Sequence, residues 1–285
     1  MLDIPGFTPV TPTADIRVER HGNRAKCLQR LIRMDLPVPQ TVAIPFATVR
    51  EIAEGQMPDL ATLIGLFEGE PMLLSVRSSS EAADWGGPNA VLNIGMNDAA
   101  HGWLSKTLGH AAADKLYLRF IRSFAIEVMR LDEEPFDAAK TPSEACIIYE
   151  EEIDDPFPQS IADQLAAVLR SMARAWDGTS ARLLRQAKGA PGDAGLGLVV
   201  QRMAQGMGPG QSGSGVVQFV NPATGEPKVT GRYMGQAMGR RDLRNSDKAI
   251  YLTRDERGPS LEDLLPEVYG ELLKVGARCR KRPRE

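Results

Sequence analysis

The sequence is short of the residues that most often build metal centres and hydrolytic sites. Its three cysteines, Cys27, Cys146 and Cys279, lie far apart and lack the spacing of metal ligands. We therefore expect three free thiols in a reducing compartment. Three histidines leave little material for a histidine metal site or a catalytic triad, and we interpret each as a solvated or packed side chain. They are His21, His101 and His110.

Long apolar runs, a targeting signal and an excess of charge are missing as well. No stretch approaches the roughly 18 apolar residues of a membrane-spanning helix. The first residues have neither the basic start nor the apolar region of a signal peptide. A formal net charge of −3 and a pI near 5.8 give no overall attraction to nucleic acid or to an anionic membrane. We therefore expect a soluble, cytoplasmic protein without nucleic-acid or membrane partners.

Apolar residues recur at helical spacing in four places. The first predicted helix covers Arg24–Met34 and is ended by Pro37, and the second region covers residues 100–131. A third helix begins after Ser160 and a last one after Ser260, because serine is a favoured residue before the first helical turn.

Short apolar runs bounded by turn residues predict strands. These runs are Thr41–Ile44, Pro71–Val76, Val91–Ile94, Cys146–Tyr149, Leu198–Met203, Val216–Val220 and Val229–Met234. Helices mixed with antiparallel hairpins indicate an α+β fold rather than a doubly wound parallel sheet. With 42% hydrophobic residues, the 285-residue chain is long enough for one large domain or two lobes.

Two glycine-containing segments are candidates for phosphate binding. Residues 208–213 match the spacing of a dinucleotide loop, but strand-like residues follow where that loop needs a helix, so we interpret them as a flexible hairpin turn. No Walker sequence is present. In the second segment, Arg77 stands at a strand end and is followed by Ser78 and by Gly86-Gly87. This order is suited to presenting a guanidinium fork and backbone N–H groups to a triphosphate, although strand-end arginines are common.

The acidic stretch Glu150–Asp155 offers oxygen ligands of the kind that hard cations prefer. Nothing in the sequence fixes the geometry of these side chains. A solvated loop is therefore the favoured interpretation.

Taken together, several strings in this order resemble the N-terminal nucleotide-binding domain of pyruvate, phosphate dikinase. The matching strings are Gly22-Asn23-Arg24, Leu36-Pro37-Val38-Pro39, Ser75-Val76-Arg77-Ser78 through Val91–Asp98, Pro191-Gly192-Asp193, Val200-Gln201-Arg202-Met203, Gly213-Ser214-Gly215 and Asn221–Glu226. The resemblance covers nearly the whole chain. It implies an ATP-grasp-like, two-lobed fold with a helical insertion.

By this resemblance, residues 1–98 and 160–194 form the first lobe, residues 99–159 a shortened helical insertion, and residues 195–285 a second lobe with a mostly antiparallel sheet and a C-terminal helix. ATP is the implied cofactor. The phosphates are expected near Arg24, Arg77, Ser78, Gly86 and Arg185. The adenine is expected between the lobes, near Val200, Gln201 and Met203.

The chain departs from the family pattern where charge matters most. Arg24 replaces a lysine, which keeps the charge but changes the shape. Glu81 stands where the family has a second arginine, and Ser180 where another is expected. At the implied metal end, Asn221 and Arg232 replace acids, and Met238 replaces a glutamine. Arg240 and Arg241 replace a Glu-Asp pair. Magnesium prefers oxygen ligands, so its participation is doubtful.

Three functions follow from this combination. The first is an ATP-binding domain whose phosphoryl transfer is weakened or lost, which makes it a pseudoenzyme. The second is an active phosphotransferase subunit that phosphorylates a histidine on a separate protein, because the chain lacks the Thr-Ser-His phosphoacceptor motif of the family. The third is a scaffold that docks on a full-length relative, using Arg240-Arg241 and the basic residues 278–282, although a solvated tail is the simpler interpretation of the latter.

Overall fold

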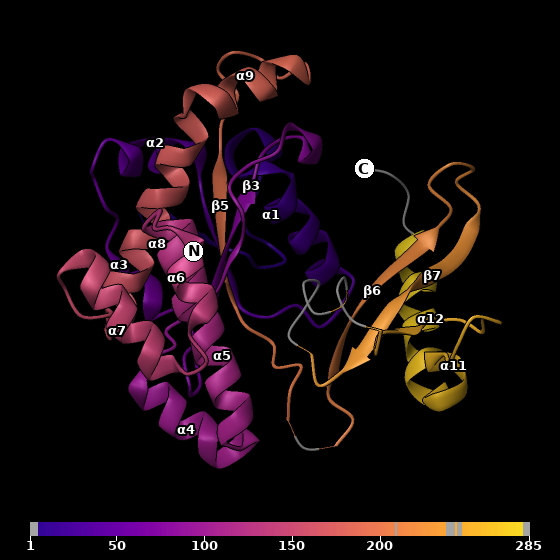
Figure 1. The fold of residues 1–285 in the computed structure, drawn as a ribbon. Helices are drawn as coiled ribbons and strands as arrows, with labels where there is room; N and C mark the ends of the chain where they lie inside the picture. Colours follow the sequence, from indigo (N-terminus) through magenta and orange to yellow (C-terminus); the bar gives the residue numbers. More distant parts are fainter. Residues whose placement is uncertain (1–4, 209, 238–242, 244–246, 282–285) are drawn as a thin grey trace. The chain divides into compact units, whose positions relative to one another are not determined.

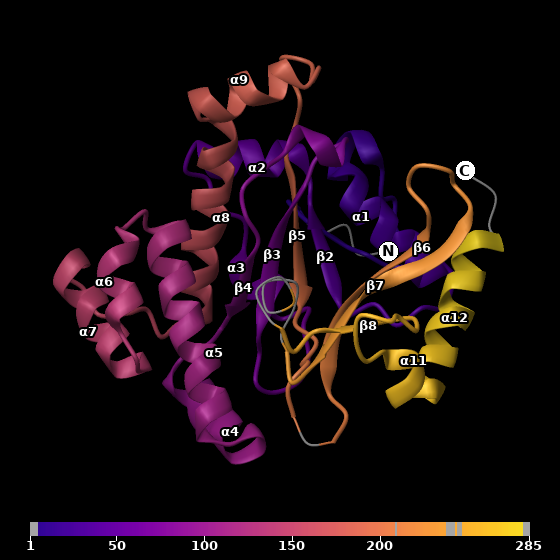
Figure 2. The ribbon, with the colours of Figure 1, turned by 45° about the vertical axis from the view of Figure 1, so that its right-hand side comes forward.

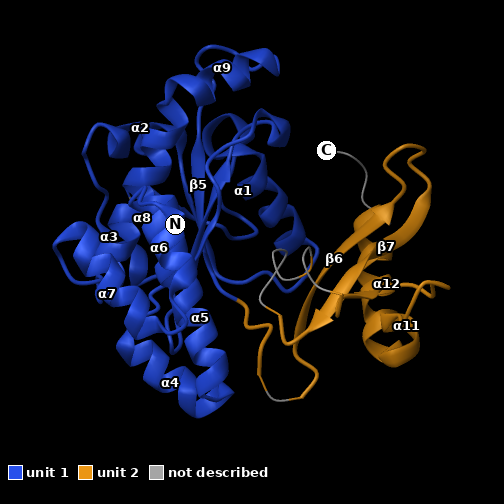
Figure 3. Ribbon diagram, viewed as in Figure 1, with its two compact units in different colours: residues 1–203 blue, residues 204–285 orange. Residues whose placement is uncertain are grey.

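The computed structural model describes residues 5–208, 210–237, 243 and 247–281. The chain folds into two compact units, of which unit 1 comprises residues 1–203 and unit 2 residues 204–285 (Figure 3). Both units combine helices with antiparallel strands, so the α+β prediction is confirmed. In the described part of the chain, no helix combines the length and the apolar character needed to cross a membrane.

Unit 1 is built on a five-stranded sheet whose strand order is β1-β2-β5-β3-β4, with every neighbouring pair antiparallel. The strands are β1 (Thr8–Pro9), β2 (Thr41–Ile44), β3 (Leu74–Ser79), β4 (Val91–Ile94) and β5 (Gly197–Arg202). The central strands carry aliphatic side chains that are almost completely buried, such as Ile44, Val76 and Val199. This double-sided burial explains why the sequences of these strands are continuous apolar runs.

Helices cover both faces of this sheet (Figures 1 and 2). Helix α1 (Val18–Arg33) packs on one face, against β3 and β5, and α8 (Ile161–Asp177) packs on the other, against β3 and β4. Ser160 accepts a hydrogen bond from the Asp163 N–H, which confirms it as the residue that caps α8. Gln164 of α8 is fully buried and bonds to the backbone at Gly95, so the helix is fixed to the end of β4.

A group of helices follows β4. It comprises α4 (Asp98–Leu108), α5 (His110–Ser123), a π-helical turn at Phe124–Val128, α6 (Glu133–Ala138) and α7 (Pro142–Ile153). The ring of Phe157 lies 5.2 to 6.1 Å from four other aromatic rings of this group. Such edge-on contacts add to the apolar burial that holds the helices together. The remaining helices of unit 1 are α2 (Phe46–Ala53), α3 (Leu60–Ile64) and α9 (Thr179–Ala187), with a 3₁₀ turn at Ala83–Trp85.

The strand predicted at Cys146–Tyr149 is wrong, because these residues lie inside α7. Thr141 accepts a hydrogen bond from the Glu144 N–H, and Pro142 occupies the first helical turn, where its missing N–H does no harm. Ala145 and Tyr149, four residues apart, face the core together. The acidic stretch that follows is the end of this helix, and Asp154 closes it with a left-handed backbone.

Unit 2 contains a three-stranded antiparallel sheet, β6 (Gly213–Val220), β7 (Pro227–Gly235) and β8 (Ile250–Tyr251), with helices α11 (Leu261–Leu264) and α12 (Pro266–Lys281). Ser260 caps α11 as predicted, and the apolar pattern then continues through α12. Residues 208 and 210–213 connect two different sheets, so they are not the turn of a hairpin; Pro209 lies outside the description.

The boundary between the units differs from the one expected at residue 195. Strand β5 pairs with β2 and β3 along its whole length. Residues 195–203 therefore belong to unit 1 in the structure, and unit 2 begins with Ala204.

One of the contacts between helix α1 and β3 requires a glycine. Gly22 interrupts the helical backbone with φ 80° and ψ 167°, a conformation available almost only to glycine. A Cβ at this position would lie 1.8 Å from the carbonyl oxygen of Ser79, so the contact excludes every other residue. The Ser79 hydroxyl donates to the His21 carbonyl oxygen at 2.7 Å across the same contact.

We predict that Gly22→Ala lowers the free energy of unfolding by more than about 4 kcal/mol, since it combines backbone strain with a severe clash. Gly189→Ala is the matched control: its φ is 79° and nothing lies within 4 Å of an added Cβ. The control should lose about 1 to 2 kcal/mol from strain alone. Urea unfolding of both variants provides the comparison, and equal losses would contradict the role given to the contact.

Burial of His21 generates a prediction about pH. The imidazole is fully buried and accepts a hydrogen bond from the Arg17 N–H, and burial lowers its pKa below the ordinary value. The His21 imidazole of the unfolded chain therefore becomes protonated near pH 6.5, whereas in the folded chain it is still neutral at that pH. Stability from this group is complete above about pH 6.5 and declines as the pH falls below it. NMR titration should show that the His21 imidazole remains neutral at pH values below the ordinary histidine pKa of about 6.5. Protonation of His21 at or above that pH in the folded protein would refute this.

Candidate functional site

The end of β3 and the kinked start of α1 form the first candidate site. The Asn23 N–H donates to the Ser80 carbonyl oxygen at 2.8 Å, and the Arg24 Nε donates to the Ser78 carbonyl oxygen at 2.7 Å. Ser79, which stands between Ser78 and Ser80, bonds to the His21 carbonyl oxygen as described above. The backbone of β3 thus fixes both the position and the direction of the Arg24 side chain.

These elements enclose a cavity of about 410 Å³, here called the arginine cavity. It is lined by Asn23, Arg24, Cys27, Ser78, Ser79, Ser80, Ala83, Gly86 and Gly87. No carboxylate is among these lining residues. Three of the predicted binding residues, Arg24, Ser78 and Gly86, are therefore brought together.

Arg77 is not among these lining residues, but it precedes Ser78 on β3 and lies on the face of the sheet that α1 covers. Side chains alternate along a strand, so Arg77 points to the same face as Ser79, whose hydroxyl bonds to α1. Partial burial lowers the pKa of both Arg77 and Arg24, and the positive charge of Arg24 lowers the pKa of Arg77 further. Neither guanidinium forms an ion pair with any described residue. An exposed Arg24 and a half-buried Arg77 thus influence each other and have no counterion among the described residues.

The loop after β3 adds backbone donors to the same place. Gly86 has φ 83° and Gly87 has φ 159°, and both residues are exposed. Their N–H groups make no hydrogen bond within the described chain. A Cβ on Gly87 would approach the Ser78 hydroxyl to 3.0 Å, so the glycine permits the loop to pass close to Ser78. Unpaired N–H groups that share the arginine cavity with Arg24 form a surface suited to an anion.

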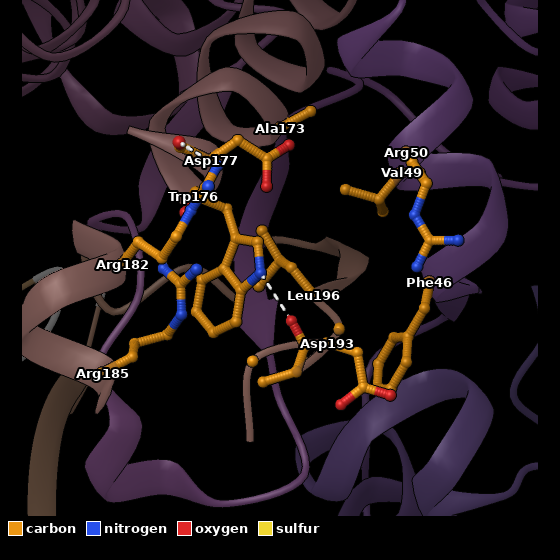
Figure 4. Close-up of a pocket in the computed structure, with 13 residues that line it drawn as sticks. Phe46, Val49, Arg50, Ala173, Trp176, Asp177, Arg182, Arg185, Asp193 and Leu196 are labelled. Carbon is orange, nitrogen blue, oxygen red and sulfur yellow. Dashed lines mark hydrogen bonds between the residues drawn. The ribbon is translucent and has the colours of Figure 1, made fainter. Parts of the chain in front are cut away.

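Arg185, another predicted phosphate ligand, lies in a second cavity. This tryptophan cavity has a volume of about 270 Å³ and contains Trp176, Arg182 and Arg185 on one side and Phe46 and Arg50 across from them (Figure 4). Arg185 is buried, and its guanidinium stacks 3.6 Å from the centre of the Trp176 ring. It also donates to the Trp176 carbonyl oxygen at 2.6 Å. The structure does not place Arg185 among the residues that line the arginine cavity.

The charges in the tryptophan cavity are mixed. The carboxylates of Asp177 and Asp193 line it beside three arginines (Figure 4). The Trp176 indole N–H donates to the Ala194 carbonyl oxygen at 3.0 Å. The two carboxylates partly balance the arginines, and the Arg185 guanidinium is already stacked on Trp176 and bonded to its carbonyl oxygen. The tryptophan cavity is therefore a weaker candidate for binding a polyanion than the arginine cavity.

Gln201 and Met203 lie at the opposite end of β5 from the arginine cavity. The Gly197 end of this strand pairs with Ser79, whereas Gln201 pairs with Ser75. Gln201 is buried, and its side-chain amide donates to the Thr41 hydroxyl at 2.8 Å. The Met203 N–H donates to the Leu73 carbonyl oxygen at 2.9 Å. The Gln201 side chain and the Met203 N–H are therefore already engaged within unit 1.

Comparison with known proteins finds similarity to pyruvate, phosphate dikinases. The chain is 28% identical to pyruvate, phosphate dikinase of Rhizobium meliloti (strain 1021) over 307 residues, covering 90% of this chain and 34% of the relative. It is 28% identical to pyruvate, phosphate dikinase of Clostridium symbiosum, covering 76% and 27%, and 30% identical to pyruvate, phosphate dikinase 1, chloroplastic, of Oryza sativa subsp. japonica, covering 71% and 23%. No protein-family model matches. The chain is related to the pyruvate, phosphate dikinases.

The chain spans about a third or less of the length of these pyruvate, phosphate dikinases. The alignment with the Rhizobium meliloti protein runs over 307 residues, more than the 285 of this chain. The relative therefore contains segments that this chain lacks.

In unit 2, the described residues at the metal end expected from pyruvate, phosphate dikinase do not fit magnesium. The Asn221 Oδ1 accepts from the Ala223 N–H within a turn. Arg232 donates to the Ala249 carbonyl oxygen at 2.7 Å and stacks 4.2 Å from the Tyr251 ring. Met238, Arg240 and Arg241 lie outside the described residues. Within the described ranges, no group of three or more His, Cys, Asp or Glu side chains could hold a metal ion.

Lys188 is a residue that sequence reasoning missed. Its ammonium Nζ lies 3.8 Å from the position that a Cβ on Gly86 would occupy. Lys188 is separated from Gly86 by about a hundred residues, and no motif points to it. The sequence shows only that a basic residue follows the segment that forms α9, which does not indicate a contact with Gly86.

We predict that Arg77→Gln leaves the free energy of unfolding of the ligand-free protein unchanged or raises it by up to about 1 kcal/mol, because it removes an unpaired, partly buried charge. The Arg77 side chain makes no hydrogen bond to a described residue that would be lost. Arg170→Gln on the exposed side of α8 is the control and should change nothing. Urea unfolding in a chloride buffer at low ionic strength is the measurement. A clear destabilisation specific to Arg77→Gln would show that the charge serves the fold.

Proposed function

We propose that this chain is an ATP-binding domain of the pyruvate, phosphate dikinase type, equivalent to the N-terminal nucleotide-binding region, with weakened or lost phosphoryl transfer. The similarity to pyruvate, phosphate dikinases supports the domain type. The observation that carries the binding site is the placement of Arg24, which is exposed in the arginine cavity and bonded to the Ser78 carbonyl oxygen, near the half-buried Arg77 on the same strand end. Neither guanidinium forms an ion pair with a described residue.

The polyphosphate of ATP would supply the missing counterion. Arg24 presents the rest of its guanidinium to the cavity while its Nε remains bonded to Ser78. Arg77 would contribute a second charge, and the N–H groups of Gly86 and Gly87 would donate to phosphate oxygens. The Ser78 hydroxyl, which makes no hydrogen bond among the described residues, is a further donor at the wall of the cavity.

Phosphoryl transfer is expected to be weak because, besides residues that bind ATP, it requires a metal ion that neutralises charge at the reacting phosphate. In phosphoryl transfer a metal ion usually bridges the phosphate oxygens and stabilises the charge of the transition state. Here Arg232 occupies an expected metal-ligand position and is engaged with Ala249 and Tyr251. Loss of comparable electrostatic contacts in other enzymes costs about 3 to 4 kcal/mol each in transition-state stabilisation.

The proposal includes an ATP-grasp-like arrangement in which helices α4 to α7 are the helical insertion. These helices follow β4 directly and pack mainly on one another and on that strand. The segments present in the Rhizobium meliloti relative but absent here are compatible with a shortened insertion.

Calorimetric titration of ATP into the purified protein, first with magnesium and then with EDTA, tests the function. We predict binding in both buffers, at micromolar to submillimolar Kd, and loss of at least about 1.5 kcal/mol of binding free energy in Arg77→Ala. Arg170→Ala is the matched control. Absence of binding in both buffers would refute the proposal.

The same preparation tests whether transfer survives. Incubation with labelled ATP and a separate histidine-bearing acceptor domain should give no phosphohistidine. Magnesium-dependent labelling that Arg77→Ala abolishes would instead support an active phosphotransferase subunit.

A further inference from the structure

Lys188 lies beside the loop that contains Gly86 and Gly87, here called the glycine loop, and Arg185 at the end of helix α9 fixes its backbone. The turn after α9 is closed by hydrogen bonds from the N–H groups of Lys188 and Ala190 to the Arg185 carbonyl oxygen, at 3.0 and 3.1 Å. Arg185 is itself buried and stacked on Trp176. A Cβ on Gly87 would lie 3.8 Å from the same tryptophan ring. The turn and the glycine loop therefore rest on one shared side chain.

The Lys188 ammonium is available to a ligand. Its side chain is exposed and has no hydrogen bond or ion pair within the described residues, although Glu81 and Asp84 belong to the neighbouring loop. The Nζ lies 3.8 Å from a Cβ position on Gly86, and the Gly86 N–H is unpaired as well. A lysine with a free ammonium next to free backbone donors is a common arrangement for binding phosphate.

We propose that Lys188 is a third cation of the arginine cavity and that the cavity binds polyphosphate without a metal ion. This inference rests on the proposed function and adds the ligand class. Arg24 and Arg77 approach a polyphosphate from α1 and β3, and Lys188 approaches it from the turn after α9. Three positive charges would balance most of the charge of a triphosphate, which magnesium otherwise neutralises. Arg185, expected to contact phosphate, acts instead as a positioning residue for Lys188.

Binding of ATP, AMP and inorganic triphosphate in EDTA tests this assignment. Lys188→Ala should weaken the binding of ATP and of triphosphate about tenfold, as expected for loss of one charged hydrogen bond. AMP, whose single phosphate reaches fewer of the cations, should bind within about twofold of its wild-type Kd. Lys188→Arg should restore most of the loss. Lys106→Ala, which removes an exposed lysine of α4, is the matched control.

The outcomes separate this inference from the proposed function. If wild type binds ATP in EDTA but Lys188→Ala binds it as tightly as Lys106→Ala does, the role of Lys188 is refuted and the ATP-binding function stands. Equal weakening for AMP and ATP would show a structural effect and would also overturn the assignment. If the wild-type protein binds ATP only in the magnesium buffer and not in EDTA, metal-free binding is refuted. If it binds no nucleotide in either buffer, the proposed function itself fails.

Discussion

The close approach of Gly22 to Ser79 is the constraint on which the candidate site depends. A backbone carbonyl of β3 occupies the place where any other residue would carry its Cβ, so helix α1 must bend at this point. The bend directs the following turn along the end of β3, where hydrogen bonds fix Asn23 and Arg24 to the backbone of the strand. The same strand carries Arg77 on the face that α1 covers. Two guanidinium groups are thus brought together by backbone contacts that are independent of their charge.

The charges of Arg24 and Arg77, unpaired among the described residues, lower the stability of the ligand-free protein and favour the binding of an anion. Partial burial and mutual repulsion lower the pKa of Arg77, and no described carboxylate pairs with either arginine. Like charges without counterions disfavour the folded state unless the surrounding structure holds them in place. The buried sheet and the contact at Gly22 do so, which leaves the charges ready for an anion. The tryptophan cavity differs, because there Arg185 is stacked and bonded internally, and its contribution is to hold a turn.

The two units differ in how they relate to the pyruvate, phosphate dikinases. In unit 1, arginine, hydroxyl and glycine groups line one cavity at the end of β3, where we propose that phosphate binds. In unit 2, the described positions expected to bind metal are part of the fold, because Asn221 closes the turn before β7 and Arg232 packs on Tyr251.

The sequence by itself determined the local features whose causes are local. The limits of β2 and β4 follow from short apolar runs, the starts of α8 and α11 from capping serines, and the grouping of Arg24, Ser78 and Gly86 from their resemblance to a known pattern. The segment at Cys146–Tyr149 has the composition of a strand, but it lies inside α7, which Thr141 caps and in which Tyr149 packs against Phe157. Tertiary structure alone decided that β5 belongs to unit 1, that Arg185 stacks on Trp176, and that Lys188 reaches Gly86. The reason is that strand pairing and side-chain contacts over a hundred residues depend on how the sheet assembles, which no local pattern records.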